Sequence, residues 1–257
     1  MIRTAVYGCG HLGSIIAEEL KNGKIEDAEL CCIGSRSYVT ASGLASRLSV
    51  PAAASVDLLL KEKPDYIFEA VRGEAAKEII LASLNAGIDI IVLSTGVFSD
   101  TSFYKNALEA AKLHSAKVHL VPGAIGGFDI LGAAQLMGGF SSARVIKTLD
   151  EDFTERVYGK RIKDFFGSCP FNATSGDAYR TAPGMMNIAV SAALATKGLN
   201  ETHVTVTPSD CASFTVSAEG GFGRSIATVE FGERDVDYAA YSALYVLKRL
   251  TSHISIG

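Results

Sequence analysis

The sequence predicts an α/β protein in which a doubly wound parallel sheet is followed by a second domain of α+β type. Through the first 123 residues, short apolar runs alternate with amphipathic helical patterns, as in parallel sheets covered on both faces. The spacing G-x-G-x-x-G follows the first apolar run directly. After residue 124 the strand patterns come in groups, which is typical of an α+β arrangement.

Each element of the first half follows from its local pattern. The strands are continuous apolar runs, and the helices have apolar residues spaced by turns, with Gly23 and Gly87 as helix stops. Strands are expected at 2–7, 28–34, 65–71, 88–95 and 116–123, and helices at 12–23, 39–48, 73–87 and 102–114.

The second half predicts a sheet of antiparallel character together with helices. Helices are expected at 128–139 and 185–198, and strands at 144–149, 155–162, 203–208, 213–219 and 225–231. A strongly periodic helix ends the chain. The domains are therefore expected to be a dinucleotide-binding domain at 1–123, with the helix at 235–254 packing back on it, and a substrate and dimerisation domain at 124–234.

Composition excludes several classes of function. The 257 residues carry a net charge of −4, which provides no basic field for nucleic acid. No apolar run approaches the ~20 residues of a membrane helix, and the strand-like start differs from a secretory leader. The five cysteines lack C-x-x-C pairs, and the five histidines lack zinc-ligand spacing. We expect a cytoplasmic protein without a metal, acting on a small molecule.

The glycine motif predicts a dinucleotide site of Rossmann type. Gly8 allows a tight turn, Gly10 lets a pyrophosphate approach the backbone, and Gly13 permits close packing of helix on strand. The phosphates are expected at the helix N-terminus, where free N–H groups favour an anion. The alternative is a plain glycine-rich turn. The residues predicted to lie over the phosphates with these glycines are Cys9, His11 and Leu12.

The second strand indicates which cofactor is preferred. An acidic residue at its end would bind the ribose of NAD, but Ser35 and Arg36 stand there instead. A guanidinium pairs well with a 2′-phosphate, so NADP is favoured over NAD, the alternative being a solvated arginine. Two later strand ends should also line the cofactor. Their residues are Ala70, Val71, Ser94 and Thr95.

Taken together, these segments resemble the L-aspartate dehydrogenase family over most of the chain. The GAIGG-F/L-D pattern, present at 121–129, is the most specific of them. The resemblance implies an NAD(P)-dependent enzyme that converts L-aspartate into iminosuccinate, and so into oxaloacetate plus ammonia. A homodimer is expected separately, with an exposed face of the second domain's sheet as its interface. The other segments that carry it are 65–71, 85–100, Pro183, 187–198, 202–210 and 220–223.

The resemblance also implies where the substrate binds. The bare amides of the glycine loop can hold a substrate carboxylate, whereas a hinge turn is the alternative use of those glycines. The residues implied to bind substrate are Gly123, Ala124, Ile125, Gly126 and Asn187.

The sequence departs from the family where that family handles substrate protons. Members carry N-x-H before the G-x-F-G motif, and here Ala212 and Phe214 occupy those positions, while Met185 replaces an asparagine. Phenylalanine neither accepts a proton nor donates a hydrogen bond, so oxidation of L-aspartate is expected to be weak or absent unless another group acts. The candidates for that group are Asp177, His203 and Asp210.

Two alternatives therefore stay open beside an aspartate dehydrogenase. One is a related amino-acid or oxo-acid dehydrogenase or reductase with a different substrate. The other is a dinucleotide-binding regulatory protein that has lost catalysis. Turnover distinguishes them, because function is decided by the site and not by the fold.

Overall fold

The computed structural model describes residues 1–232 and 237–254 and shows two compact units. One unit comprises residues 1–123 with 236–257, and the other comprises residues 124–235. The boundary expected between residues 234 and 235 lies outside the described residues. Among the helices of the described part, none is long and apolar enough to cross a membrane.

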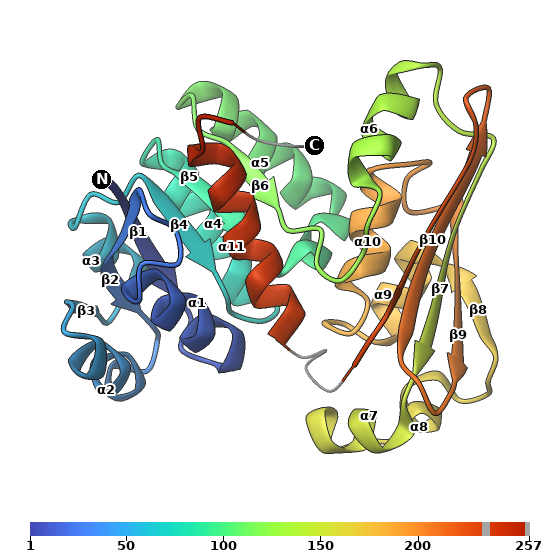
Figure 1. Cartoon of the computed structure of the whole chain (residues 1–257), viewed down its shortest axis with the longest axis horizontal. Coiled ribbons are helices and arrows are strands. Elements are labelled where there is room, and N and C mark those ends of the chain that lie inside the picture. The colour runs from blue at the N-terminus through green and yellow to red at the C-terminus, as the bar shows by residue number, and fades with distance from the viewer. Residues whose placement is uncertain (233–236, 255–257) are drawn as a thin grey trace. The chain divides into compact units, whose positions relative to one another are not determined.

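The first unit contains a six-stranded parallel sheet (Figure 1). The strand order is β3-β2-β1-β4-β5-β6. Successive strands are added toward one edge from β1 to β3 and toward the other edge from β4 to β6, so the strand order reverses between β1 and β4, as in doubly wound nucleotide-binding sheets. Such a reversal opens a crevice at the carboxyl ends of the two central strands. The strands are β1 (Ile2–Tyr7), β2 (Ala28–Gly34), β3 (Ala52–Ala53), β4 (Tyr66–Glu69), β5 (Asp89–Val92) and β6 (Val118–Leu120).

Helices cover both faces of this sheet. In Figure 1, α1 and α11 lie together in front of it, and α4 and α5 lie behind it. The apolar stripe of α1, with Ile16 and Leu20, packs in one core with Leu244 and Leu247 of α11. The helices are α1 (His11–Lys21), α2 (Tyr38–Leu48), α3 (Val56–Leu60), α4 (Glu74–Asn85), the 3-10 helix η1 (Thr95–Ser99), α5 (Thr101–Leu113) and α11 (Tyr238–Thr251).

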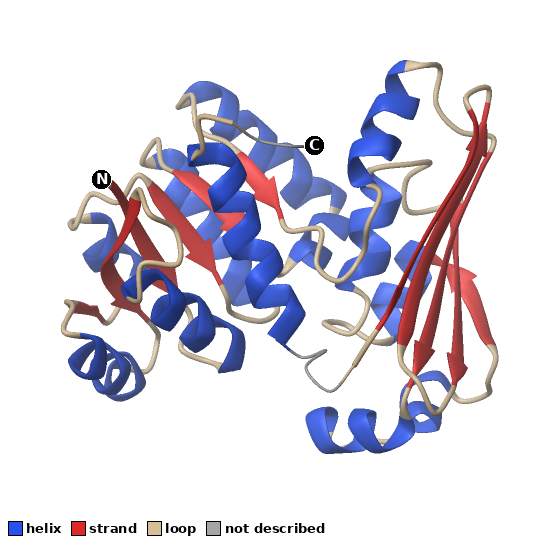
Figure 2. Cartoon of the chain, viewed as in Figure 1, coloured by secondary structure: helices blue, strands red, loops and turns tan. Residues whose placement is uncertain are grey.

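The second unit is a five-stranded sheet with helices on one face (Figure 2). Its strand order is β11-β10-β7-β9-β8. Val145, Val204 and Val216 of the sheet share a core with Leu131 and Ala189 of the helices. The elements are α6 (Phe128–Leu136), β7 (Ser142–Leu149), α7 (Glu151–Tyr158), α8 (Ile162–Phe166), β8 (Phe171–Thr174), α9 (Ser175–Thr181), α10 (Asn187–Leu194), β9 (Thr202–Pro208), β10 (Ser213–Gly220) and β11 (Gly223–Glu230).

The strand expected at 155–162 is wrong, because α7 and α8 occupy this region. The side chain of Asp150 accepts a hydrogen bond from the Phe153 amide at 2.6 Å and so caps α7. Two acidic residues follow in the first turn, and Gly159 ends the helix in a left-handed conformation. These end signals outweigh the local alternation of apolar residues.

The sheet of the second unit also differs from its expected antiparallel form. β7 and β9 pair in parallel, while the other three strand pairs are antiparallel, so the sheet is mixed. α10 covers Asn187–Leu194 and is shorter than the helix expected at 185–198. β8 and α9 were not expected from the sequence. They are short elements of four and seven residues, and such lengths leave little periodicity to detect.

Candidate functional site

The glycine turn after β1 lies directly against the end of β4. A Cβ at Gly8 would lie 2.3 Å from the Ala70 carbonyl oxygen, and one at Gly13 would lie 1.9 Å from the Gly8 carbonyl oxygen. A Cβ at Gly10, in contrast, would meet nothing within 4 Å. Gly8 and Gly13 are therefore required by packing, while Gly10 leaves the surface in front of α1 open.

The N-terminus of α1 is free of side-chain caps. Gly10 is the N-cap, and the first turn contains no acidic residue. His11 is exposed, and its Nε2 lies 2.8 Å from the Asp237 carboxylate, whereas Leu12 packs against the core. The Cys9 thiol is directed to the Gly34 carbonyl, and burial raises its pKa, so it is a neutral side chain at physiological pH. This open, uncapped helix end fits a dinucleotide pyrophosphate.

The residues after β2 lie at the same edge of the sheet. The Ser35 amide donates to the Ala53 carbonyl at 3.2 Å, which fixes the turn. Arg36 is exposed, and among the described residues its guanidinium makes no hydrogen bond or ion pair. Its position leaves all its donors available to an anionic ligand.

Glu69, which was not expected as a site residue from the sequence, connects the loops that follow β4 and β5. Its Oε1 accepts from the Val71 amide at 2.8 Å, and its Oε2 accepts from the Ser94 amide at 2.9 Å. The Ser94 hydroxyl donates in turn to the Val71 carbonyl. Burial raises the pKa of Glu69 to about 7, against the effect of these hydrogen bonds. The signal in the sequence was its position as the last residue of the apolar run "YIFE".

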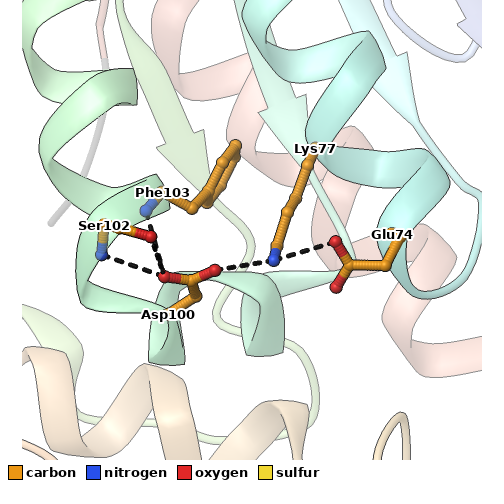
Figure 3. Close-up of polar contacts among 5 residues, drawn as sticks. All are labelled: Glu74, Lys77, Asp100, Ser102 and Phe103. Atoms are coloured by element: carbon orange, nitrogen blue, oxygen red, sulfur yellow. Dashed lines mark hydrogen bonds and ion pairs between the residues drawn. The ribbon is translucent and has the colours of Figure 1, made fainter.

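A cluster of charged side chains, Glu74, Lys77 and Asp100, lies at the junction of η1 and α5 (Figure 3). Lys77 of α4 lies 2.8 Å from Asp100 and 2.9 Å from Glu74. Asp100 also caps α5, accepting from the Ser102 and Phe103 amides at 2.9 and 3.1 Å. The hydrogen bond from Lys77 is the main reason that the pKa of Asp100 lies far below its usual range. The cluster fixes the end of η1, which begins with Thr95 directly after Ser94.

The glycine loop lies at the start of the second unit. Ala124 and Ile125 are buried, and Gly127 is the N-cap of α6 with φ +83° and no side-chain cap. A Cβ at Gly126 would meet only the Cβ of Ala227, at an ordinary 3.9 Å. Packing within this unit therefore does not require glycine at 126. Gly123, the last residue of the first unit, has φ +66°, which favours glycine there.

Lys147 lies beside the residues that depart from the family pattern. It is buried, its Nζ donates to the Met185 carbonyl at 2.6 Å, and it lies 4.8 Å from the centroid of the Phe214 ring. Burial lowers the pKa of its amine to about 8. Asn187 begins α10 two residues after Met185. Lys147 was not expected as a site residue from the sequence, although the alternation of Val145, Lys147 and Leu149 places it on the apolar face.

The other titratable candidates are not brought together with these residues. Asp177 is exposed in α9 and bonds to Thr174 and Arg180, which lower its pKa. His203 points to the exposed face of β9, and Asp210 is exposed in the loop before β10. None of the three shares the buried face on which Lys147 lies.

Sequence comparisons show which known proteins the chain resembles. Residues 8–121 match a family model described as the NAD binding domain of homoserine dehydrogenase. An L-aspartate dehydrogenase of Methanocaldococcus jannaschii is 27% identical over 271 residues, and the alignment covers 100% of both chains. One from Pseudomonas aeruginosa is 27% identical over 87% of this chain and 86% of its own length.

The fold is also found in solved structures. Aspartate dehydrogenase from Thermotoga maritima aligns with a TM-score of 0.76 at 20% identity, covering 100% of both chains. GenD2 from gentamicin A biosynthesis, solved in complex with NAD, aligns with a TM-score of 0.63 at 14% identity, covering 99% of this chain and 88% of its own.

The doubly wound unit and its open glycine turn, together with these relatives, define an NAD(P)-dependent oxidoreductase. The matches to dehydrogenases extend through both units. Over its full length the chain is similar to L-aspartate dehydrogenases.

Proposed function

We propose that this protein oxidises L-aspartate to iminosuccinate and uses NADP in preference to NAD. The glycine loop is the observation that carries the substrate assignment. It brings uncapped backbone amides to the start of α6, and packing within the second unit does not account for glycine at 126. Such amides bind carboxylates well, and the full-length relatives are named for a dicarboxylic amino acid.

In this proposal each unit has its own task. The first unit holds the dinucleotide through Gly10, the N-terminus of α1 and the loops that Glu69 joins. When bound, the nicotinamide accepts a hydride from the substrate Cα. The second unit orients the substrate through Gly126 and Asn187, so that the hydrogen on Cα is presented in one direction.

A screen of L-amino acids with NADP and with NAD tests the proposal. We expect reduction of the cofactor with L-aspartate, and the reverse reaction with oxaloacetate and ammonia. Turnover with another amino acid alone would identify a related dehydrogenase of different specificity. Cofactor binding without any turnover would favour a regulatory protein, the alternative that the loss of histidine at position 214 supports.

Replacing Arg36 with alanine is expected to weaken NADP binding by about 10- to 100-fold, the effect of losing a charge-assisted hydrogen bond. NAD affinity should stay within about threefold, because NAD has no 2′-phosphate for Arg36 to contact. Calorimetry with both cofactors measures this difference. The matched control is Arg249→Ala on α11, where the arginine is also exposed. Equal losses for both cofactors in Arg36→Ala would contradict the NADP assignment.

Replacing Gly126 with alanine is expected to raise the KM for aspartate about tenfold or more, because a methyl group would hinder a carboxylate at the backbone amides. The fold should tolerate this change, since the added Cβ makes one ordinary contact. Gly132→Ala in α6 is the control, and it should leave the KM unchanged while stabilising the helix. If cofactor affinity falls in parallel with activity in Gly126→Ala, the loop has a structural role instead.

The homodimer also remains a proposal. The helix-free face of the second unit's sheet is its candidate interface (Figure 2). Light scattering over a range of protein concentrations would measure the mass, and a monomer at all concentrations would refute it.

A further inference from the structure

Lys147 is the one buried lysine among the described residues, and it is placed on the helix-covered face of the second sheet. In the register of β7 and β10 it stands directly opposite Phe214. On its other side, β9 places Val206 opposite it. Its amine donates to the Met185 carbonyl and lies 4.8 Å from the centroid of the Phe214 ring.

The elements proposed to bind substrate lie on this same face. Gly126 and Gly127 pack against Ala227 of β11, which is two residues from Val229, the residue that pairs with Phe214. Ala227 lies two strands away from Lys147 across the sheet and two residues away along the strands. With the usual spacings of a β-sheet, their Cα atoms are about 12 Å apart. A lysine side chain and a four-carbon dicarboxylate together span this distance. On the other side, the segment that receives the Lys147 hydrogen bond leads directly into Asn187.

We propose that Lys147 takes the proton from the substrate amine, in place of the histidine that Phe214 replaces. The inference rests on the proposed function and names the group that the sequence alone did not supply. It is carried by the cross-strand pairing of Lys147 with Phe214 and by the position of its amine under the segment before Asn187.

The step balances in atoms and charge. The substrate ammonium gives one proton to the neutral amine of Lys147, which becomes an ammonium ion. The Cα–H bond then breaks, its electron pair leaves as hydride for the oxidised nicotinamide, and the nitrogen lone pair forms the C=N bond of iminosuccinate. In the reverse direction the Lys147 ammonium returns the proton to nitrogen. Lysine with a lowered pKa is suited to this exchange near neutral pH.

Burial is the cause of the lowered pKa of Lys147. Val206 faces it from β9, Phe214 from β10 and the Met185 carbonyl from the segment before α10. Among the described residues, none of these elements presents a charged side chain to it, and Lys147 makes no ion pair there. The Phe214 ring favours the ammonium form, so it opposes the effect of burial and does not cause it.

The pH dependence of kcat/KM is the first part of the test. Since the neutral amine is needed, the wild-type value for aspartate oxidation should rise with pH through about 8 and then level off. Lys147→Gln keeps a donor for the Met185 carbonyl but cannot take a proton. We expect a loss of roughly 10²- to 10⁴-fold and no rise near pH 8 in this variant. Lys112→Gln, an exposed lysine of α5, is the control and should match the wild type.

A second measurement does not depend on turnover. In protein labelled with ¹³C at the lysine Cε, one resonance should titrate near pH 8 and be missing from Lys147→Gln. Saturation with succinate, a dicarboxylate without the amine, should raise this pKa by about one unit or more, because an anion would then lie near the ammonium. A lysine that only supports Met185 would titrate identically with and without succinate.

The outcomes separate the two proposals. Wild-type protein that neither oxidises an amino acid nor binds a dicarboxylate refutes the proposed function. Turnover in wild type that Lys147→Gln retains within about threefold, with the same rise near pH 8, overturns the assignment of Lys147 alone. A Lys147 resonance unmoved by bound succinate also overturns it.

Discussion

Gly13→Ala is expected to destabilise the first unit by about 3 kcal/mol or more, the largest effect of any single methyl group that we anticipate. Its Cβ would lie 1.9 Å from the Gly8 carbonyl oxygen, and backbone atoms of a buried turn cannot move aside as a flexible side chain would. Relief would require α1 to move away from β1 and to break the core that it shares with α11. Urea denaturation should show a large fall in the midpoint, or a protein that does not fold.

Gly10→Ala is the matched control for this prediction. Nothing lies within 4 Å of the added Cβ, and the φ of −76° suits alanine, so stability should change by less than about 1 kcal/mol. NADP affinity should nevertheless fall at least tenfold, since the methyl group would occupy the surface that the pyrophosphate approaches. Equal stability of the two variants would contradict the packing argument. Unchanged affinity in Gly10→Ala would contradict the placement of the pyrophosphate.

The second large effect is the pH dependence that Lys147 gives to stability. Burial lowers its pKa to about 8, while the unfolded chain keeps the usual 10.5. Between these values the unfolded state binds more protons than the folded state, so the contribution of Lys147 to stability increases as pH rises. Two and a half pKa units correspond to about 3 kcal/mol across this window.

Lys147→Met tests this effect, because methionine has a similar length and no charge. The free energy of unfolding of the wild type should rise relative to Lys147→Met between pH 8 and 10.5, and the difference should be constant below pH 7. The lost hydrogen bond to Met185 adds a constant offset and does not alter this slope. Parallel stability curves over the whole pH range would show that Lys147 is not buried as a titrating amine.

The cofactor unit was predictable because its signals are local. Gly8, Gly10 and Gly13 reveal the turn through their spacing, and the alternation of apolar strands with helices predicts the parallel sheet that places the other strand ends beside it. The NADP preference rests on Ser35 and Arg36 in the same way and stays a prediction. The position of the GAIGG loop at the start of a helix was likewise readable from sequence.

The site in the second unit was less accessible to sequence reasoning. Lys147 and Glu69 each stand in an apolar pattern, and charged residues there are normally interpreted as exposed, because most of them are. Only the sheet register and the hydrogen bonds reveal that both are buried. The parallel pairing of β7 with β9 depends on contacts distant in the chain, which no local pattern encodes. At 155–162, capping by Asp150 and Gly159 overrode an alternation that resembles a strand.

Transfer of deuterium from L-[2-²H]aspartate to the oxidised cofactor is the most direct measurement of the central claim, that this chain removes a hydride from the Cα of aspartate. We expect the reduced NADP formed by the wild-type protein to carry one deuterium, detected by mass spectrometry, and its formation to become faster as pH rises through 8. Bound NADP that stays oxidised in the presence of L-aspartate would contradict that claim.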